Sequence, residues 1–298
     1  MTNTSCILAC DMGGTIIKSA CIFSDGNIIG KINMIPSNSS GSLEEIIKAW
    51  KETFDCLAKT VSENSLDITG IGVSTPGPFY YKEKKSLMRH KFQSIHGINL
   101  EKEIRKTVSL PDVPFEFFQD ANCFLAGEQT YGVAKGYKNC ACVTLGTGLG
   151  FSVMADGKFL SNGRDACYIA LYRQPWKDGI IEDVVSGRGI CSVYKRLSDS
   201  NEVIDAKTIG AKVKEGDTAA IETYRYFGEV LGKGIAFHLM HTYAEMLVIG
   251  GQISKDFLLF DESLITALRN EGWTGAVCQS LFPEDAALYG TAAMLFIL

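Results

Sequence analysis

The sequence predicts an α/β protein made of two similar halves. Apolar segments of strand length alternate with amphipathic segments of helix length, and this alternation is typical of α/β folds. A strand, a glycine-rich turn and a second strand occur at residue 11 and again at residue 146, 135 positions later. That spacing is close to half of the 298 residues, so it indicates a duplicated domain with a cleft between the copies. The length also exceeds the roughly 100–200 residues of one ordinary domain.

Composition excludes several classes of protein. The formal net charge is −5, whereas a nucleic-acid binder needs a clustered cationic surface. No apolar run approaches the roughly 20 residues that span a bilayer, and residues 1–5 lack the cationic start of a signal peptide. We therefore expect a cytoplasmic protein that binds neither nucleic acid nor membrane.

The ten cysteines are scattered, and no CxxC pair occurs. In apolar runs a free cysteine behaves as a small buried hydrophobe, and five of the ten stand in such runs: Cys6, Cys10, Cys21, Cys140 and Cys142. We expect reduced thiols in the core rather than a framework of disulfides or zinc.

The first half opens with two strands around a turn. Residues 6–10 form an apolar run that ends at Asp11, and residues 16–23 resume a strand-like composition. A helix is predicted from Ser42 to about residue 61, because apolar residues follow one helical face and Ser42 with Glu45 forms a capping box. The later expected elements are strands at 68–73 and 114–118 and a helix at 100–108.

The second half repeats this plan. Residues 140–145 and 151–155 are strands on either side of a glycine turn at 146–150. A long helix is predicted over residues 219–242, and its glycines at 228, 232 and 234 would cost stability unless a neighbouring backbone approaches closely. A buried strand at 246–249 then leads into Gly250 and Gly251.

Three glycine turns each follow a buried strand, and together they predict a nucleotide-phosphate site. Glycine lets backbone N–H groups approach phosphate oxygens, and the hydroxyls of Thr15 and Thr147 add donors. A single turn of this kind is more often only a hairpin. Neither G-x-x-x-x-G-K-[ST] nor a G-x-G-x-x-G strand–helix unit occurs, which disfavours the P-loop and Rossmann alternatives.

Two aspartates stand at predicted strand ends. Asp11 in the first turn suits Mg²⁺, which prefers carboxylate and water oxygens and accompanies bound phosphates. Asp120 directly follows an apolar strand, where a carboxylate could accept a proton from a hydroxyl. An Asp-Ala-Asn run can equally provide a helix N-cap, so both roles stay open for Asp120.

The chain resembles the ROK family, which groups sugar kinases with related repressors. The resemblance rests on motifs in order and spacing along nearly the whole chain: Asp11-Met-Gly-Gly-Thr15, Gly72-Val-Ser-Thr-Pro-Gly77, Asp120-Ala-Asn122, Thr144-Leu-Gly-Thr-Gly-Leu-Gly150, Glu182 with Ser186-Gly-Arg-Gly189, Val248-Ile-Gly-Gly251 and Glu284 to Gly290. It implies a duplicated actin-like, hexokinase-type (ribonuclease H-like) two-domain fold with an interdomain cleft. We expect domains at 1–118 and 119–284, with a C-terminal helix at about 285–298 packing back on the first.

The resemblance also implies a role for particular residues. Asp120 matches the catalytic base that receives the proton of a sugar hydroxyl. Asp11 matches a residue of the phosphate-binding loop and would hold Mg²⁺. The ATP-binding residues would be Asp11, Gly13, Gly14, Thr15, Lys18, Gly146, Thr147, Gly148, Gly250 and Gly251. The sugar-binding residues would be Thr75, Gly77, Gln119, Asn122 and Glu182. A homodimer is the expected assembly.

The sugar side departs from the family pattern. Family kinases carry Gly-Glu-Ile-Gly-His after the second glycine turn, whereas residues 163–172 here contain no histidine. The zinc loop that normally follows is reduced to residues 173–179, with only Cys167 nearby, so we expect no structural zinc. Gln119 replaces the usual asparagine before the catalytic aspartate.

These features predict an ATP- and Mg²⁺-dependent kinase for a hexose, an N-acetylhexosamine or a sugar-like polyol. A non-catalytic sugar-binding regulator of the same family, lacking a DNA-binding domain, is the alternative that the altered sugar side favours. The basic residues at 82–85 and 89–91 are typical of a solvated loop, although their position after Gly77 also allows a role at the rim of the acceptor site.

Overall fold

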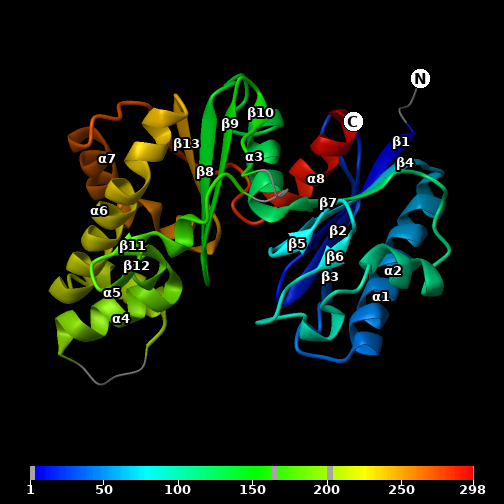
Figure 1. Cartoon of the computed structure of the whole chain (residues 1–298), viewed down its shortest axis with the longest axis horizontal. Coiled ribbons are helices and arrows are strands. Elements are labelled where there is room, and N and C mark those ends of the chain that lie inside the picture. Colours follow the sequence, from blue (N-terminus) through cyan, green and yellow to red (C-terminus); the bar gives the residue numbers. More distant parts are fainter. Residues whose placement is uncertain (1–3, 163–166, 200–203, 298) are drawn as a thin grey trace. The chain divides into compact units, whose positions relative to one another are not determined.

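The computed structural model describes residues 4–162, 167–199 and 204–297, which divide into two compact units (Figure 1). The first unit contains the chain up to Tyr131, a short piece beginning at Ser161, and the C-terminal segment from Asp285. The second unit contains residues 132–160 and 167–284. The first unit therefore continues to Tyr131, beyond the boundary at 118 that the sequence suggested.

A five-stranded sheet forms the centre of the first unit, in the order β3-β2-β1-β4-β7. β1 pairs antiparallel with β2 and parallel with β4, and β4 pairs parallel with β7. The strands are β1 (Ser5–Met12), β2 (Ile16–Ile22), β3 (Ile28–Pro36), β4 (Asp67–Thr75) and β7 (Phe115–Gln119). A small hairpin of β5 (Phe79–Tyr80) and β6 (Lys85–Ser86) and the 3₁₀ turn η1 (Gln93–Ile95) follow β4.

Helices cover both faces of this sheet (Figure 1). Alternate residues of β1 point to opposite faces, so Leu8 and Cys10 pack with α1 and α2 while Ile7 and Ala9 pack with α8. The helices are α1 (Leu43–Asn64), α2 (Leu100–Thr107), α3 (Asp120–Thr130) and α8 (Ala286–Ile297). The expected capping box of α1 is confirmed, because the Ser42 side chain accepts from the Glu45 N–H and the Glu45 carboxylate accepts from the Ser42 N–H.

α3 and α8 cross so closely that glycine is required at the contact. A Cβ on Gly290 would lie 1.7 Å from the Cys123 carbonyl oxygen, and one on Gly127 would lie 2.1 Å from the Ala286 carbonyl oxygen. This contact fastens both α3 and the C-terminal helix to the first unit. It explains why the unit extends past β7, and no local pattern in either segment signals it.

The second unit repeats the sheet topology. Its strand order is β10-β9-β8-β13-β14, with β8 antiparallel to β9 and parallel to β13, and β13 parallel to β14. The strands are β8 (Cys140–Leu145), β9 (Leu149–Ala155), β10 (Lys158–Phe159), β13 (Met246–Gly250) and β14 (Ala276–Gln279). The two central sheets therefore share one pairing scheme, as expected for a duplication.

Helices and short turns complete the second unit. They are α4 (Gly187–Ser198), α5 (Ala206–Lys214), α6 (Thr218–His241), α7 (Asp261–Asn270), η2 (Leu171–Arg173), η3 (Ile181–Asp183), η4 (Gln252–Leu259) and a hairpin of β11 (Pro175–Trp176) and β12 (Gly179–Ile180). The glycines of α6 meet α7 closely: a Cβ on Gly228 would lie 2.5 Å from the Phe260 carbonyl oxygen, and one on Gly232 would lie 2.9 Å from that of Leu264. Within the described residues, none of these helices is both long enough and apolar enough to cross a membrane.

Candidate active site

Three neighbouring parallel strands of the first unit end beside one another and carry the polar residues of the site. In the register of the sheet, Asp11 of β1 lies opposite Ser74 of β4, and Thr75 of β4 lies opposite Gln119 of β7. Asp120 follows immediately as the first residue of α3. The carboxyl ends of parallel strands are the usual place for a ligand in such sheets. The structure thus places Asp11 and Asp120 near each other at this edge of the sheet.

The Asp11 carboxylate is held in an unfavourable environment for its charge. Burial raises its pKa to about 6, the hydrogen bond from Ser74 Oγ to Oδ1 at 2.8 Å opposes this rise, and the negative charge of Asp120 adds to it. Lys18 lowers the pKa, but its ammonium forms an ion pair at 2.8 Å with Asp285. A half-buried carboxylate repelled by a second carboxylate fits a bound divalent cation, because the cation would offset both charges.

The turn between β1 and β2 divides into a closed and an open part. Gly13 donates its N–H to the carbonyl oxygens of Asp11 and Ile16, and a Cβ on Gly13 would lie 2.6 Å from the latter oxygen. Gly13 therefore shapes the turn from within. Thr15 is exposed and Gly14 is half-exposed, so these two residues form the part of the turn that a phosphate group could reach.

Asp120 is suited to accept a proton. Burial raises its pKa, while the hydrogen bond from the Ala121 N–H to Oδ1 at 2.8 Å and the charge of Lys91 lower it. The N-cap position of α3 belongs to Gln119, so the N-cap role left open for Asp120 is wrong in its position. Asp120 instead begins the helix itself.

A pocket of about 260 Å³ opens beside the end of β7. Gln119 and Asn122 line it together with Tyr81, Phe118 and Met294, whereas Asp120 is not part of its wall. The side-chain oxygen of Gln119 is enclosed and accepts no hydrogen bond from the described residues. An enclosed acceptor without a donor is costly, so this oxygen is a natural point for a ligand hydroxyl.

Thr75 and Gly77, the two sugar-binding residues expected at the end of β4 and in the loop after it, lie in different surroundings. Thr75 is fully buried, and its hydroxyl is directed at Met12 Sδ and the Pro76 carbonyl oxygen. It therefore holds the loop from inside, and direct contact of its side chain with a sugar does not fit this geometry. Gly77 has open space on the side where a Cβ would be.

The glycine turns of the second unit adjoin each other. Gly251, with a φ of +82°, would place a Cβ only 2.4 Å from the carbonyl oxygen of Leu145, directly before the turn at Gly146 to Gly148. The N–H of Gly187 at the start of α4 donates to the Gly146 carbonyl oxygen at 2.8 Å. Thr147 at the tip of the turn is exposed. Gly250 ends β13 opposite Thr144 of β8.

Glu182 lies against this second turn. Its Oε2 accepts from the Leu149 N–H at 3.0 Å and is 2.9 Å from where a Cβ on Gly148 would be. Its Oε1 pairs with Arg188 at 2.9 Å. The sequence suggested only a sugar contact for Glu182. The structure shows a second role, in which Glu182 supports the glycine turn.

Three residues of the site, Ser74, Arg188 and Asp285, were not among the predicted site residues. Ser74 lies inside the Gly72 to Gly77 motif and its hydroxyl could have been noticed, and Arg188 stands in the Ser-Gly-Arg-Gly stretch. Asp285 is 267 positions from its ion-pair partner Lys18. No local signal announces contacts over such separations.

The segment that replaces the family's zinc loop forms the β11–β12 hairpin. The Trp176 indole N–H donates to the Tyr226 hydroxyl at 3.2 Å, and Cys167 is half-buried. Residues 163–166 of the altered stretch lie outside the described residues. In the part of the chain that the structure describes, no three His, Cys, Asp or Glu side chains are grouped so as to hold a metal ion. The absence of structural zinc stays a prediction.

Two α/β units with one sheet topology, each carrying a glycine turn after its first strand, define an actin-like two-domain fold, and this prediction is confirmed. The model of the ROK family matches residues 7–171 and 172–296. The chain belongs to the ROK family.

Individual proteins agree with this assignment. The glucokinase of Thermotoga maritima is 25% identical over 97% of this chain and 96% of its own, and the N-acetylmannosamine kinase of Escherichia fergusonii is 24% identical over 96% and 97%. A ROK family glucokinase from Streptomyces griseus, solved with glucose and AMPPNP, has a TM-score of 0.78 at 21% identity, covering 97% of this chain and 98% of that one. At 21% identity, the similarity to this solved structure concerns the fold alone.

Proposed function

We propose that this protein is an ATP- and Mg²⁺-dependent kinase that phosphorylates a hydroxyl group of a sugar or sugar-like polyol. The observation that carries the proposal is the pair of half-buried carboxylates, Asp11 and Asp120, at the ends of β1 and β7 beside the first glycine turn. A site that only bound sugar would have no use for two carboxylates that repel each other next to a phosphate-binding turn.

Asp120 acts as the general base. The acceptor oxygen attacks the γ-phosphorus, the bond from this phosphorus to the bridging oxygen breaks, and ADP leaves with that oxygen. The proton of the acceptor hydroxyl passes to Asp120, whose raised pKa makes the transfer easier than at an ordinary aspartate.

The phosphate groups of ATP are held by the open parts of the glycine turns. Gly14 and Thr15 serve in the first unit, while Thr147 and Gly148 serve in the second, with Gly13 and Gly146 shaping their turns. Gly250 and Gly251 belong to the turn that would lie on the adenosine side of ATP. Asp11 holds Mg²⁺ directly or through water, and the charge of Lys18, which pairs with Asp285, lowers the pKa of Asp11. The metal ion, when bound, neutralises charge on the phosphates.

The acceptor is a hexose, an N-acetylhexosamine or a polyol. Gln119 and Asn122 supply polar groups beside Asp120, Gly77 leaves room at the loop after β4, and Glu182 offers its carboxylate. The names of the relatives, glucokinase and N-acetylmannosamine kinase, support this class of acceptor.

The assembly and location are further parts of the proposal. We infer a homodimer, supported by the family and by the exposed apolar side chains of Phe237 in the last turns of α6 and Tyr243 just after the helix, which are 64% and 80% accessible. A cytoplasmic location is supported by the ten cysteines, all of which are free thiols.

A coupled assay of ADP release tests the activity. The protein is incubated with ATP and Mg²⁺ and a panel of hexoses, N-acetylhexosamines and polyols, and we expect at least one acceptor to raise ADP release well above the rate without acceptor. The departure of residues 163–172 from the family's sugar-binding pattern is the one observation in favour of the alternative, a non-catalytic sugar-binding regulator. That alternative requires a sugar to raise the melting temperature while no member of the panel raises ADP release.

A further inference from the structure

Lys91 lies over the first glycine turn. Its Cδ is 3.6 Å from the position that a Cβ on Gly14 would occupy, and the side chain is half-buried. The residue belongs to the basic loop for which the sequence left two interpretations, a solvated loop or a role at the site. This approach to Gly14 and the half-burial of the side chain argue against the first interpretation for Lys91.

The backbone around Lys91 is fastened to the same turn. Phe92 is fully buried with a φ of +52°, and its N–H donates to the Ser39 carbonyl oxygen at 2.6 Å. The Ser39 hydroxyl in turn donates to the Gly14 carbonyl oxygen. Ser39 thus connects the loop of Lys91 to the turn, so the position of the lysine over Gly14 is built into the fold of the unit.

The charge of Lys91 is directed at the site. It acts on Asp120 and lowers the pKa of that carboxyl, yet no carboxylate of the described residues lies within 4 Å of its ammonium group. The neighbouring Lys18 differs, because its charge is matched by Asp285. Lys91 therefore presents a positive charge between the phosphate-binding turn and the general base, without a direct ion pair of its own.

We propose that the Lys91 ammonium group contacts a non-bridging oxygen of the γ-phosphoryl group while that group passes from ATP to the acceptor. The inference rests on the proposed kinase function and adds a catalytic residue to it. The turn at Gly14 and Thr15 holds the donor phosphates and Asp120 receives the acceptor proton, so the transferred group must travel between them. Lys91 stays protonated and forms no covalent bond, and its effect is electrostatic.

Nucleotide affinity separates this role from a structural one. For Lys91→Met we expect the affinity for AMPPNP to fall about tenfold, as for loss of one charge-assisted hydrogen bond, while the affinity for ADP stays within about twofold. Isothermal titration calorimetry in Mg²⁺ measures both constants. In turnover, kcat should fall about 10²- to 10³-fold with little change in the acceptor KM, and Lys91→Arg should restore part of the loss.

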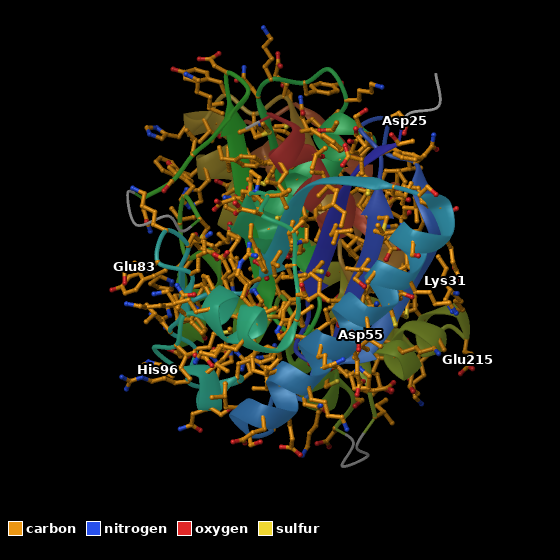
Figure 2. The ribbon with its side chains drawn as sticks, turned by 90° about the vertical axis from the view of Figure 1, so that its right-hand side faces the viewer. Asp25, Lys31, Asp55, Glu83, His96 and Glu215 are labelled. Carbon is orange, nitrogen blue, oxygen red and sulfur yellow. The ribbon has the colours of Figure 1, made fainter. Side chains whose placement is uncertain are left out.

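Arg89→Met is the matched control. It removes a cation from the same loop, but Arg89 is exposed and its Nε donates to His96 Nε2 at 3.4 Å. Figure 2 shows His96 at the surface of the first unit, pointing outward. We expect this variant to match the wild-type protein in both affinities and in kcat.

Each other outcome overturns the inference in a recognisable way. Equal losses of AMPPNP and ADP affinity would mean that Lys91 only supports the turn, and unchanged affinities with unchanged kcat would remove it from the site. A raised acceptor KM at constant kcat would assign it to the sugar. A wild-type protein that binds neither nucleotide would overturn the kinase proposal as well, whereas a functional wild type with an indifferent Lys91→Met overturns this inference alone. Lys91→Gln replaces Lys91→Met if the latter does not fold.

Discussion

Asp11 and Asp120 oppose the folding of the unit that contains them. Both residues are half-buried, burial raises the pKa of each carboxyl group, and the charge of Asp120 raises the pKa of Asp11 further. Ser74 and Lys18 offset only part of this cost for Asp11. Such a pair is expected where function, rather than stability, selects the residues.

We predict that Asp11→Asn stabilises the protein at neutral pH. Asp11 has a pKa of about 6 in the folded chain against 3.8 ordinarily, so the native state takes up a proton as the pH falls through about 6 and the cost of its charge disappears. Asparagine imitates the protonated form and keeps an acceptor for Ser74. Urea unfolding without nucleotide should show a gain of about 1–2 kcal/mol at pH 7.5 that vanishes near pH 4.

Asp55→Asn provides the control for this measurement. Asp55 is exposed on α1, where it pairs with Lys51 at 2.6 Å, and Figure 2 shows it at the surface. We expect its free energy of unfolding to change by less than about 0.5 kcal/mol. A loss of stability in Asp11→Asn at pH 7.5 would contradict the unfavourable environment assigned to Asp11.

Asp120→Asn should lower kcat by about 10²- to 10⁴-fold and leave ATP binding intact. The amide oxygen can still accept from the Ala121 N–H, so α3 should begin as before. In the wild-type protein kcat should fall as the pH decreases through the raised pKa of Asp120, whose surroundings include the charges of Asp11 and Lys91 and the thiol of Cys123. Wild-type kcat in the variant would mean that Asp120 serves only the helix.

At the scale of elements, local sequence patterns predicted those helices and contacts that depend on neighbouring residues in the chain. The capping box at Ser42 and the apolar face that follows it predicted α1, and the glycines of α6 correctly indicated a close neighbour. The extent of the first unit was missed because the crossing of α3 and α8 joins residues that are far apart in the chain. The proximity of Asp11 and Asp120 was predictable, since both follow parallel strands. The approach of Lys91 to Gly14 could not be predicted, because it depends on the path of an irregular loop.

The turn at Gly146 to Gly148 owes its shape to η3 and α4 beside it. We predict that Glu182→Ala speeds hydrogen exchange of the Leu149 amide about fivefold, because this N–H loses its acceptor, a loss of about 1 kcal/mol. Glu182→Gln keeps an acceptor oxygen and should change the exchange much less. Mass-spectrometric exchange on the peptide that contains Leu149 provides the measurement.

The kinetic constants of the two Glu182 variants assign the second role of this residue. If Glu182 also binds the acceptor, Glu182→Gln raises the sugar KM while the exchange at Leu149 stays near that of the wild type. A rise in the ATP KM in Glu182→Ala alone would attribute the effect to the turn. Unchanged exchange in Glu182→Ala would contradict the support of the turn by Glu182.

On the scale of the whole molecule, two copies of one topology carry different chemistry. The first unit has the carboxylates of Asp11 and Asp120, and the second has two adjoining glycine turns and Glu182. Both sheets keep the pairing of an antiparallel first hairpin with two parallel strands. Specialisation after duplication therefore lies in the residues at strand ends and in the connecting segments, which do not alter the core.

One such connecting segment leads us to predict that the protein contains no structural zinc. A structural site needs about four Cys or His ligands, whereas the chain between residues 163 and 186 has one cysteine, Cys167, and no histidine. The hairpin of β11 and β12 has another anchor, since Trp176 bonds to Tyr226 of α6 and Lys177 lies over the Tyr226 ring at 5.0 Å. Elemental analysis should find far less than one zinc per chain, and the melting temperature should be the same with and without a chelator. One zinc per chain, together with a melting temperature lowered by the chelator, would require cysteines from distant parts of the chain to converge on the metal.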